Sequence, residues 1–168
     1  MKLIPLKEIE KKKLYEMYQD IPKKEIGSQN DCYGISSTEF EKKLIEKIKE
    51  ENIVNEELNT TTKIYILGDN YKLIGEVGIR TTLNDFWINK GSQIYYKIRL
   101  KERNKGYGNI ILKLALEEAK KLKFKQIRIN CDDNNLASKK IILNNGGIVD
   151  IKNYKTLDGT SSSYIIKM

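Results

Sequence analysis

The sequence predicts a single α/β (α+β) domain of about seven strands and about four helices, built on a central, mixed but mostly antiparallel sheet. Three patterns carry this prediction. Apolar residues alternate along two segments within 62–80, as in an antiparallel hairpin. A strand pattern at 93–99 leads through a glycine turn into an amphipathic helix at 110–122, and a second hairpin pattern covers 148–167. No repeat, linker or low-complexity stretch divides residues 1–168, so one domain is expected.

The N-terminal part is expected to supply one strand and two helices. A short apolar run at 2–6 predicts the strand, and apolar residues at helical spacing predict a helix at 7–20 that ends before a proline. A polar loop containing glycine follows. Capping-box chemistry, at 36–39 or at 38–41, predicts the start of a second helix that runs to about Glu51.

The middle of the chain is expected to form a hairpin and a third strand. Residues 62–67 and 72–80 predict two antiparallel strands, joined by a turn through Gly68-Asp69-Asn70, where these residue types tolerate the required dihedrals. The segment 81–92 connects this hairpin to the strand at 93–99.

The C-terminal part is expected to hold a strand, a short helix and a hairpin. Alternating residues predict the strand at 126–131, and a helix is expected to open at Asn135 and to end with a left-handed cap at Gly146-Gly147. The hairpin consists of 148–155 and 162–167, with a turn through Leu157-Asp158-Gly159-Thr160.

The net charge of +8 raises the question of a nucleic-acid partner. Lysine tracts at 11–13 and 120–123 would suit phosphate contacts. They lie among glutamates on the polar faces of expected helices, which favours solvated surfaces over nucleic-acid binding. A positive field that attracts an anionic cofactor is the preferred interpretation of this charge.

The cysteines and the N-terminus bear on the cellular compartment. Cys32 and Cys131 are far apart and lack metal-ligand spacing, which argues against a disulfide framework and a zinc site and favours reduced thiols in a cytoplasm. The apolar run at residues 1–6 is too brief for a signal peptide or a membrane span, and no later segment suits a bilayer. A cytoplasmic protein with no metal and no membrane contact is expected.

The most informative stretch is Arg103-Asn104-Lys105-Gly106-Tyr107-Gly108, which joins a strand to a helix. Its glycines let the backbone approach a ligand closely, and the unpaired N–H groups of the first helical turn, together with the helix dipole, favour an anion. A pyrophosphate fits such a site. Rossmann and P-loop interpretations are disfavoured, because Ile111 stands where a third glycine would be and no Gly-Lys-Ser/Thr follows.

The surroundings of this turn carry a family resemblance. The next strand ends in Cys131-Asp132-Asp133-Asn134-Asn135, and the helix that opens with Asn135-Leu136-Ala137-Ser138 ends at Gly146-Gly147. In this order of features the chain resembles the GNAT superfamily of N-acetyltransferases, whose cofactor motif has Arg or Gln followed by Gly-x-Gly or Gly-x-Ala. More narrowly, it looks like a branch of predicted bacterial acetyltransferases of undefined substrate. The resemblance implies a GNAT-like twisted sheet that ends in the C-terminal hairpin.

The same resemblance implies a function. It implies an acetyl-CoA-dependent N-acetyltransferase that moves an acetyl group to a primary amine of a small molecule or peptide by direct attack in a ternary complex. The strand through Ile98 would splay from its neighbour and pair with the pantetheine arm, and a backbone N–H near Ile98 would polarise the thioester carbonyl. The implied cofactor-binding residues are Ile98, Arg99, Leu100, Arg103, Asn104, Lys105, Gly106, Tyr107, Gly108, Asn109, Asn135 and Ser138.

Candidates for proton transfer are few, because the chain has no histidine. Glu76, inside an apolar strand, is the candidate base if burial raises its pKa; the alternative is that it faces solvent. Tyr96, or its neighbour Tyr95, is the candidate acid, although tyrosines in a central strand also serve as core residues. Many GNAT members place an acidic tyrosine where this chain has Ile142.

Several alternatives stay open from the sequence. A catalytically inert CoA-binding regulatory module is one, and a basic nucleic-acid-binding protein is a less favoured one. The loops at 23–35 and 81–92 are expected to set acceptor specificity, and their aromatic residues would either line the acceptor pocket or anchor the loops; these are Tyr33, Phe86 and Trp87. A homodimer through the edge of the C-terminal hairpin is a further hypothesis.

Overall fold

The computed structural model describes residues 1–54, 59–69, 71–89, 91–156 and 159–168. Its elements follow one another in the order β1 (Lys2–Pro5), η1 (Leu6–Glu8), α1 (Lys11–Gln19), β2 (Lys24–Glu25), β3 (Ser28–Gln29), α2 (Ser37–Lys49), β4 (Thr62–Gly68), β5 (Leu73–Arg80), α3 (Asp85–Asn89), β6 (Ile94–Ile98), η2 (Leu100–Glu102), α4 (Tyr107–Lys121), β7 (Gln126–Asp132), α5 (Leu136–Asn144), β8 (Ile148–Thr156) and β9 (Gly159–Lys167).

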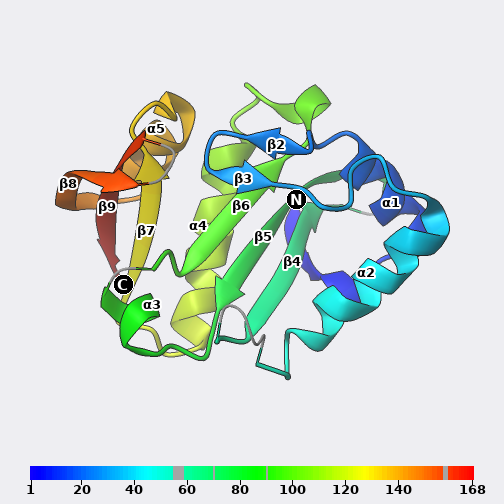
Figure 1. Cartoon of the computed structure of the whole chain (residues 1–168), viewed down its shortest axis with the longest axis horizontal. Coiled ribbons are helices and arrows are strands. Elements are labelled where there is room, and N and C mark those ends of the chain that lie inside the picture. Colours follow the sequence, from blue (N-terminus) through cyan, green and yellow to red (C-terminus); the bar gives the residue numbers. More distant parts are fainter. Residues whose placement is uncertain (55–58, 70, 90, 157–158) are drawn as a thin grey trace.

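The seven strands expected from the sequence are present, and they form two antiparallel sheets. One sheet has the order β1-β4-β5-β6, and the other has the order β7-β9-β8 (Figure 1). β6 and β7 are therefore edge strands of different sheets. This split supplies the space in which the candidate site lies.

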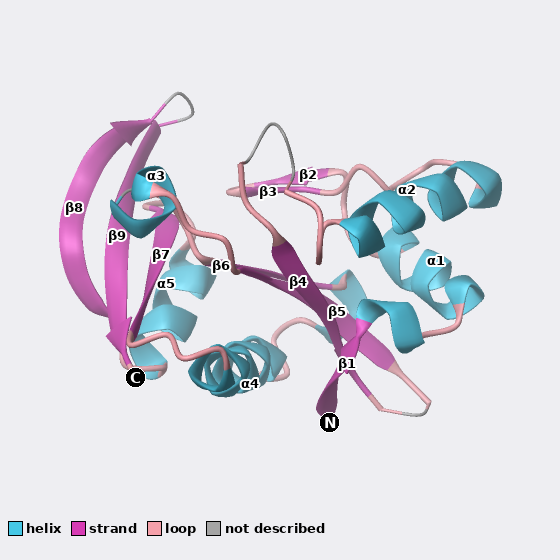
Figure 2. Cartoon of the chain, turned by 90° about the horizontal axis from the view of Figure 1, so that it is seen from below, coloured by secondary structure: helices cyan, strands magenta, loops and turns pink. Residues whose placement is uncertain are grey.

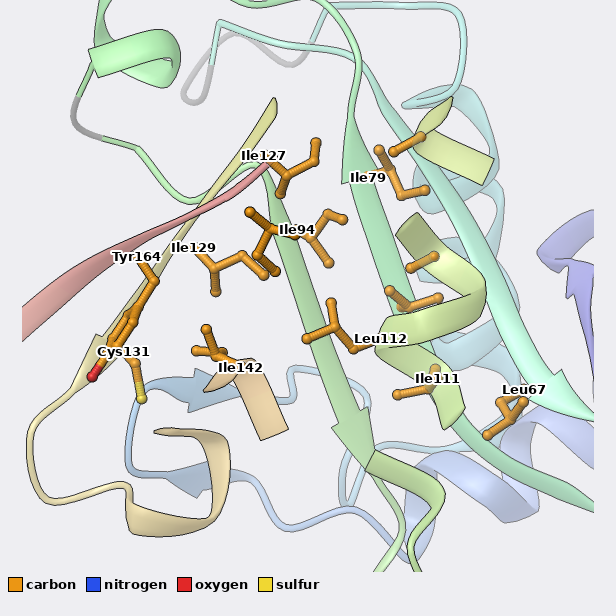
Figure 3. Close-up of a cluster of buried hydrophobic side chains, with 14 of the residues drawn as sticks. Leu67, Ile79, Ile94, Ile111, Leu112, Ile127, Ile129, Cys131, Ile142 and Tyr164 are labelled. Carbon is orange, nitrogen blue, oxygen red and sulfur yellow. The ribbon is translucent and has the colours of Figure 1, made fainter. Parts of the chain in front are cut away.

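Helix α4 holds the two sheets together through one hydrophobic core. Its buried residues Ile111, Leu112 and Ala115 pack with side chains from strands of both sheets (Figure 3). Side chains of β5, β6 and β7 reach this core, and Val77 and Ile79 of β5 and Ile127 and Ile129 of β7 do so at alternate positions, as the two-residue period of a strand requires. The helix expected at 110–122 is confirmed, and it begins three residues earlier, at Tyr107.

A second core lies on the other face of the four-stranded sheet. Helices α1 and α2 cover that face (Figure 2), and their side chains Leu14, Met17, Phe40 and Leu44 are buried against β4. Helix α2 begins with a capping box in which Ser36 and Glu39 satisfy each other's backbone N–H groups, which decides between the two caps considered from the sequence. The left-handed cap after α5 is also confirmed, at Gly146.

The helix expected at 7–20 is shorter than predicted. Residues 6–8 form a single 3-10 turn that buries Leu6, and the chain is extended at Ile9 and Glu10 before α1 begins at Lys11. With this break, Leu6 lies in the second core.

Three short elements were not anticipated: the β2–β3 hairpin and the helix α3 lie in segments expected to be loops. In the turn after β4, the Asp69 carboxylate accepts from the N–H groups of Tyr71 and Lys72. Asn70, Leu157 and Asp158, which belong to the two expected turns, lie outside the described residues.

Candidate active site

A cavity of about 1110 Å³ lies between the two sheets. Its walls are the facing edges of β6 and β7, the N-terminus of α4, helix α5 and the turn between β2 and β3. Figure 1 shows β6 and β7 diverging, with the β2–β3 hairpin across β6. Opposed strand edges that belong to different sheets leave backbone groups facing the cavity.

Gln93 closes the narrow end of this gap. Its backbone N–H donates to the carbonyl oxygen of Arg128 at 2.8 Å, and its side-chain Oε1 accepts from the Arg128 N–H at 2.8 Å. Gln93 is buried, and a weaker bond from the N–H of Asn130 to the Ser92 hydroxyl, at 3.3 Å, lies beside it. Past this clamp, β6 and β7 separate.

The free edge of β6 can be identified from its pairing with β5. Gln93 accepts from the N–H of Arg80, and the N–H of Arg99 donates to Ile74, so odd-numbered residues of β6 bond to β5. In an antiparallel pair the backbone N–H and carbonyl groups of the intervening residues point away from the partner strand. Ile94, Tyr96 and Ile98 therefore direct their backbone N–H and carbonyl groups into the gap.

Side chains occupy two of the carbonyls on this edge. The Ser92 hydroxyl donates to the oxygen of Ile94 at 2.9 Å, and Arg103 Nε donates to the oxygen of Ile98 at 2.9 Å. The N–H groups of Tyr96 and Ile98 face the cavity, which is where the family resemblance implies a carbonyl-polarising donor.

The N-terminus of α4 forms the opposite end of the cavity. Asn104 and Gly106 have φ angles of 59° and 82°, and no side chain caps the helix at Gly106. Gly106, Tyr107, Gly108 and Asn109 all line the cavity, and the N–H of Asn109 donates to the Gly106 oxygen at 3.1 Å. Consecutive N–H groups at an uncapped helix start are suited to an anion.

Gly108 has a packing role that its sequence motif does not indicate. A Cβ at this position would collide with the side chain of Ile141 in α5, and so glycine permits α4 and α5 to pack closely. The backbone of α4 at Gly108 thus lies close to the Ile141 side chain of the neighbouring helix α5.

Arg103 and its neighbours divide into cavity-lining and buttressing residues. Arg103 and Asn104 line the cavity, but the Arg103 guanidinium is held in a bidentate pair with Glu25 of β2, at 2.5 and 2.7 Å. Lys105 lies outside the cavity lining, where its Nζ donates to the backbone oxygen of Lys101 and lies 3.3 Å from Glu102. The loop conformation is therefore fixed largely by its own side chains.

Arg99 and Leu100, expected to contact the cofactor, also lie outside the cavity lining. The N–H of Arg99 is used within the sheet, and its guanidinium pairs with Asp20 at 2.7 Å. The N–H of Leu100 donates to the Asp20 oxygen, also away from the gap.

Tyr96, Asn135 and Ser138 meet across the cavity. The Tyr96 hydroxyl lies 2.9 Å from that of Ser138, and Asn135 caps α5 by accepting from the N–H of Ser138 at 3.0 Å. Asn135 also donates to the carbonyl oxygen of Ile26 at 3.2 Å, which ties α5 to the β2–β3 turn. Burial raises the pKa of Tyr96 to about 12, with a smaller opposing effect from Ser138.

Glu76 is fully buried, on the face of β5 that α1 and α2 cover. Tyr18 donates a hydrogen bond to it, Lys47 Nζ lies 3.3 Å from Oε2, and Lys97 Nζ lies 3.9 Å from Oε1. Burial alone would raise the pKa of Glu76, but the two lysines and the Tyr18 hydroxyl lower it below its usual value. The expected upward shift is therefore wrong, and Glu76 does not line the cavity.

The remaining sequence candidates have clear places. Ile142, which stands where the resemblance implies a tyrosine, is buried in the core that contains the α4 residues. Trp87 is buried at an edge-to-face contact with Phe86, whereas Tyr33 is exposed, and none of these three aromatic residues lines the cavity. Cys131 does line it, with a pKa that burial raises.

Local sequence patterns did not reveal Glu25, Lys47 or Lys97 as site residues. Lys97 follows Tyr95 by two positions in β6, and this spacing places both side chains on one face of the strand. Glu25 and Lys47 come from elements remote in sequence. Within the described part of the chain, no group of three or more Cys, Asp or Glu residues is placed to hold a metal ion.

Comparison with known proteins adds independent findings. Residues 3–148 match the family model described as the acetyltransferase (GNAT) domain. No curated protein matches the chain significantly. No described helix has the length and apolarity needed to cross a bilayer.

Three solved structures illustrate the similarity in fold. Over 99% of its length the chain is similar to the microcin C7 self-immunity acetyltransferase in complex with acetyl-CoA and AMP, with 17% identity, a TM-score of 0.69 and 91% of that chain covered. An aminoglycoside acetyltransferase in complex with coenzyme A gives 13% identity, a TM-score of 0.68 and coverage of 99% and 94%. A variant spermidine N-acetyltransferase from Vibrio cholerae gives 13% identity and a TM-score of 0.65, with 99% of this chain and 95% of that chain covered.

Proposed function

The chain belongs to the GNAT family of acetyltransferases, and from this premise we propose that it transfers the acetyl group of acetyl-CoA to a primary amine of a small molecule or peptide. As a member of this family it is an acyltransferase that uses acetyl-CoA. The observation that carries the finer proposal is the gap between β6 and β7, which combines an uncapped helix start at one end with free strand-edge N–H groups along its side.

The cofactor follows the gap in this proposal. Its pyrophosphate binds the N–H groups of Gly106, Tyr107 and Gly108, whereas the N–H of Asn109 already donates to the Gly106 oxygen at 3.1 Å. Its pantetheine arm pairs with the free edge of β6 as an added strand. Arg103 and Asn104 shape the turn, and Asn135 and Ser138 form the opposite wall. Neighbours with a similar fold were solved with acetyl-CoA or coenzyme A bound, which supports this placement.

The amine attacks the thioester carbon directly, with no acyl-enzyme. A backbone N–H on the gap edge, at Ile98 or two residues earlier at Tyr96, meets the negative charge that develops on the carbonyl oxygen. The attacking amine must be neutral, and we assign the proton that it loses to solvent in the open cavity. Glu76 serves as the buried counterion of Lys47 and Lys97.

Tyr96 is the candidate acid, and its environment sets what it can do. A full proton transfer from a phenol of pKa about 12 to a thiolate whose thiol has a pKa near 8.5 would be uphill by about 5 kcal/mol. Tyr96 therefore stabilises the departing thiolate as a hydrogen-bond donor, and the thiolate takes its proton from solvent.

A charge placed at the helix start tests the cofactor site. Asn109→Asp puts a carboxylate in the first turn of α4, where it stabilises an uncapped helix by about 0.3–1 kcal/mol but repels a pyrophosphate. We expect acetyl-CoA affinity, measured by calorimetry, to fall at least about 10-fold while the melting temperature stays equal or rises. Thiol release should fall in parallel at sub-saturating acetyl-CoA.

Wild-type protein that shows no acetyl-CoA binding would refute the proposal. Unchanged affinity in Asn109→Asp would refute the placement of the pyrophosphate. A second candidate function, an inert CoA-binding module, is favoured by Ile142 at the position of the family's tyrosine. Tight acetyl-CoA binding with no thiol release above the buffer rate, over a broad panel of primary amines, would favour that module.

A further inference from the structure

Arg80 lies at the end of the cavity that is remote from the α4 N-terminus. It is the last residue of β5, and it lines the cavity there together with Ser92 and Tyr95. The guanidinium carbon lies 4.2 Å from the ring centroid of Trp87 and 5.3 Å from that of Tyr95, and Nη1 donates to the carbonyl oxygen of Ser92. Two aromatic rings and a backbone oxygen thus hold the cation in place.

Part of this guanidinium has no partner. The Nε atom of Arg80 is buried and makes no hydrogen bond within the described chain. None of the ion pairs among the described residues includes Arg80. Burial lowers the pKa of Arg80, with Tyr95 and Glu50 opposing the shift, but a guanidinium stays charged at neutral pH. A buried donor without an acceptor is costly. An anionic ligand in the cavity would stabilise the charge of this guanidinium.

Lys97 adds a second positive charge on the same face of β6. Lys97 lines the cavity, and its ammonium donates to the carbonyl oxygen of Gln29 and lies 3.9 Å from the Glu76 carboxylate. Glu76 is completely buried behind Lys47 and Lys97. The cavity wall therefore includes Lys97 and not Glu76.

The acidic residues of the cavity wall do not offset these charges. Glu25 is paired with Arg103, and Glu102 lies in contact with Lys72 and Lys105. Asp132 accepts from the N–H of Asn134 at 2.8 Å, at the far end of β7. Among the described residues, none of these carboxylates forms an ion pair with Arg80 or Lys97.

We infer that the acceptor amine carries an acidic group, a carboxylate or a phosphate, and that Arg80 binds this group with Lys97 adding to the positive field. This inference rests on the proposed function. With the pyrophosphate at the α4 N-terminus, the acetyl group lies toward the start of β6, because a strand advances about 3.3 Å per residue along the pantetheine arm. The acidic group at Arg80 then places the amine beside the thioester. The same field disfavours polycationic acceptors.

A binding experiment isolates this site. The protein is first saturated with CoA, whose phosphates occupy the α4 end, and is then titrated with matched amines: glycine against glycinamide, and O-phosphoethanolamine against ethanolamine. Trp87 is the single tryptophan of the chain and stacks on Arg80, so its fluorescence reports on the site. The two pairs separate carboxylate from phosphate recognition.

We expect the acidic member of at least one pair to bind about 10-fold or more tightly than its neutral counterpart. Arg80→Gln, which keeps donors but removes the charge, should abolish this preference and leave CoA affinity within about 2-fold. Lys42→Gln, an exposed position on α2, matches the change in net charge and should keep the preference.

No preference for either acidic member in the wild type, whether both members bind equally or neither binds, would overturn the inference. A preference that survives in Arg80→Gln would overturn the assignment to Arg80. CoA binding measured beforehand tests the proposed function separately, so a protein that binds CoA and acetylates neutral or cationic amines would retain the proposed function and lose only this inference.

Discussion

Glu76 shows how the surroundings of one side chain set its chemistry. A carboxylate inside an apolar strand would be expected to take up a proton, because burial penalises its charge. Here the Tyr18 hydroxyl and two lysine ammoniums face it from α1, α2 and β6, and they hold it ionised. A carboxylate with a lowered pKa is a weak proton acceptor, so Glu76 supports the site through Lys97.

Replacing Glu76 tests this role. Glu76→Gln leaves Lys47 and Lys97 partly buried without their counterion, and should cost about 3 kcal/mol in the free energy of unfolding at pH 7, measured with urea. Because the folded-state pKa is lowered, the stabilisation by Glu76 is present above its unfolded pKa of about 4.3 and is lost as the pH falls toward the folded value. Glu76→Gln should lack that acid-dependent loss.

Glu41→Gln removes an exposed partner of Lys11 and should change stability little, which makes it the matched control. If Glu76→Gln kept the wild-type stability but turned over about 100-fold more slowly or worse, Glu76 would instead be the general base.

At the scale of elements, β6 contributes to more parts of the structure around the cavity than its neighbours do. Its odd-numbered residues bond to β5 and send Tyr95 and Lys97 toward the face of the sheet that carries Glu76. Its even-numbered residues pack Ile94 against α4 while their backbone groups face the gap. One strand therefore contributes to the sheet, to the core and to the edge on which we propose that the cofactor binds. Its junction with β7 sets the geometry of the cavity.

Gln93 offers a test of that junction. Gln93→Leu keeps the volume but leaves the N–H of Arg128 without its side-chain acceptor in a buried place, which should cost about 1–3 kcal/mol in urea denaturation. Acetyl-CoA affinity should also fall, because the gap is no longer fixed at its narrow end. Gln126→Leu, at the exposed start of β7, should stay within about 0.5 kcal/mol of the wild type. Equal stability and equal acetyl-CoA affinity in the two variants would contradict the role of Gln93 in joining β6 to β7.

Most elements could be predicted from the sequence because their periodicity and caps are local. The strands, the capping box at Ser36 and the glycine cap at Gly146 all depend on residues within a few positions. The β2–β3 hairpin could not be predicted, because two-residue strands have no period.

The turn that begins at Arg103 was predictable because its motif is contiguous, and the family resemblance also pointed to Ile98, Asn135 and Ser138, which line the cavity. The partners of these and other buried groups meet through tertiary contacts: Arg103 and Glu25 are 78 positions apart, and Tyr18 and Glu76 are 58 apart. The direction of the Glu76 pKa shift depends on such remote partners, and so the local pattern around Glu76 predicted the opposite direction.

At the scale of the whole molecule, the cavity has groups suited to anions at both ends. One end offers backbone N–H groups at a helix start, and the other offers the side-chain cations Arg80 and Lys97. Between them runs an unpaired strand edge, which we propose that the cofactor completes. The net charge of +8 adds a long-range field that favours anionic ligands at both ends.

Amide hydrogen exchange in β6, measured by NMR with and without CoA, tests whether the cofactor completes this edge. If the pantetheine arm pairs with it, exchange at Tyr96 and Ile98 should slow by about 10-fold or more on CoA binding. The amides of Tyr95 and Lys97, which lie at the positions bonded to β5, should change little and serve as internal controls. CoA binding that leaves the exchange of Tyr96 and Ile98 unchanged would contradict this mode of binding.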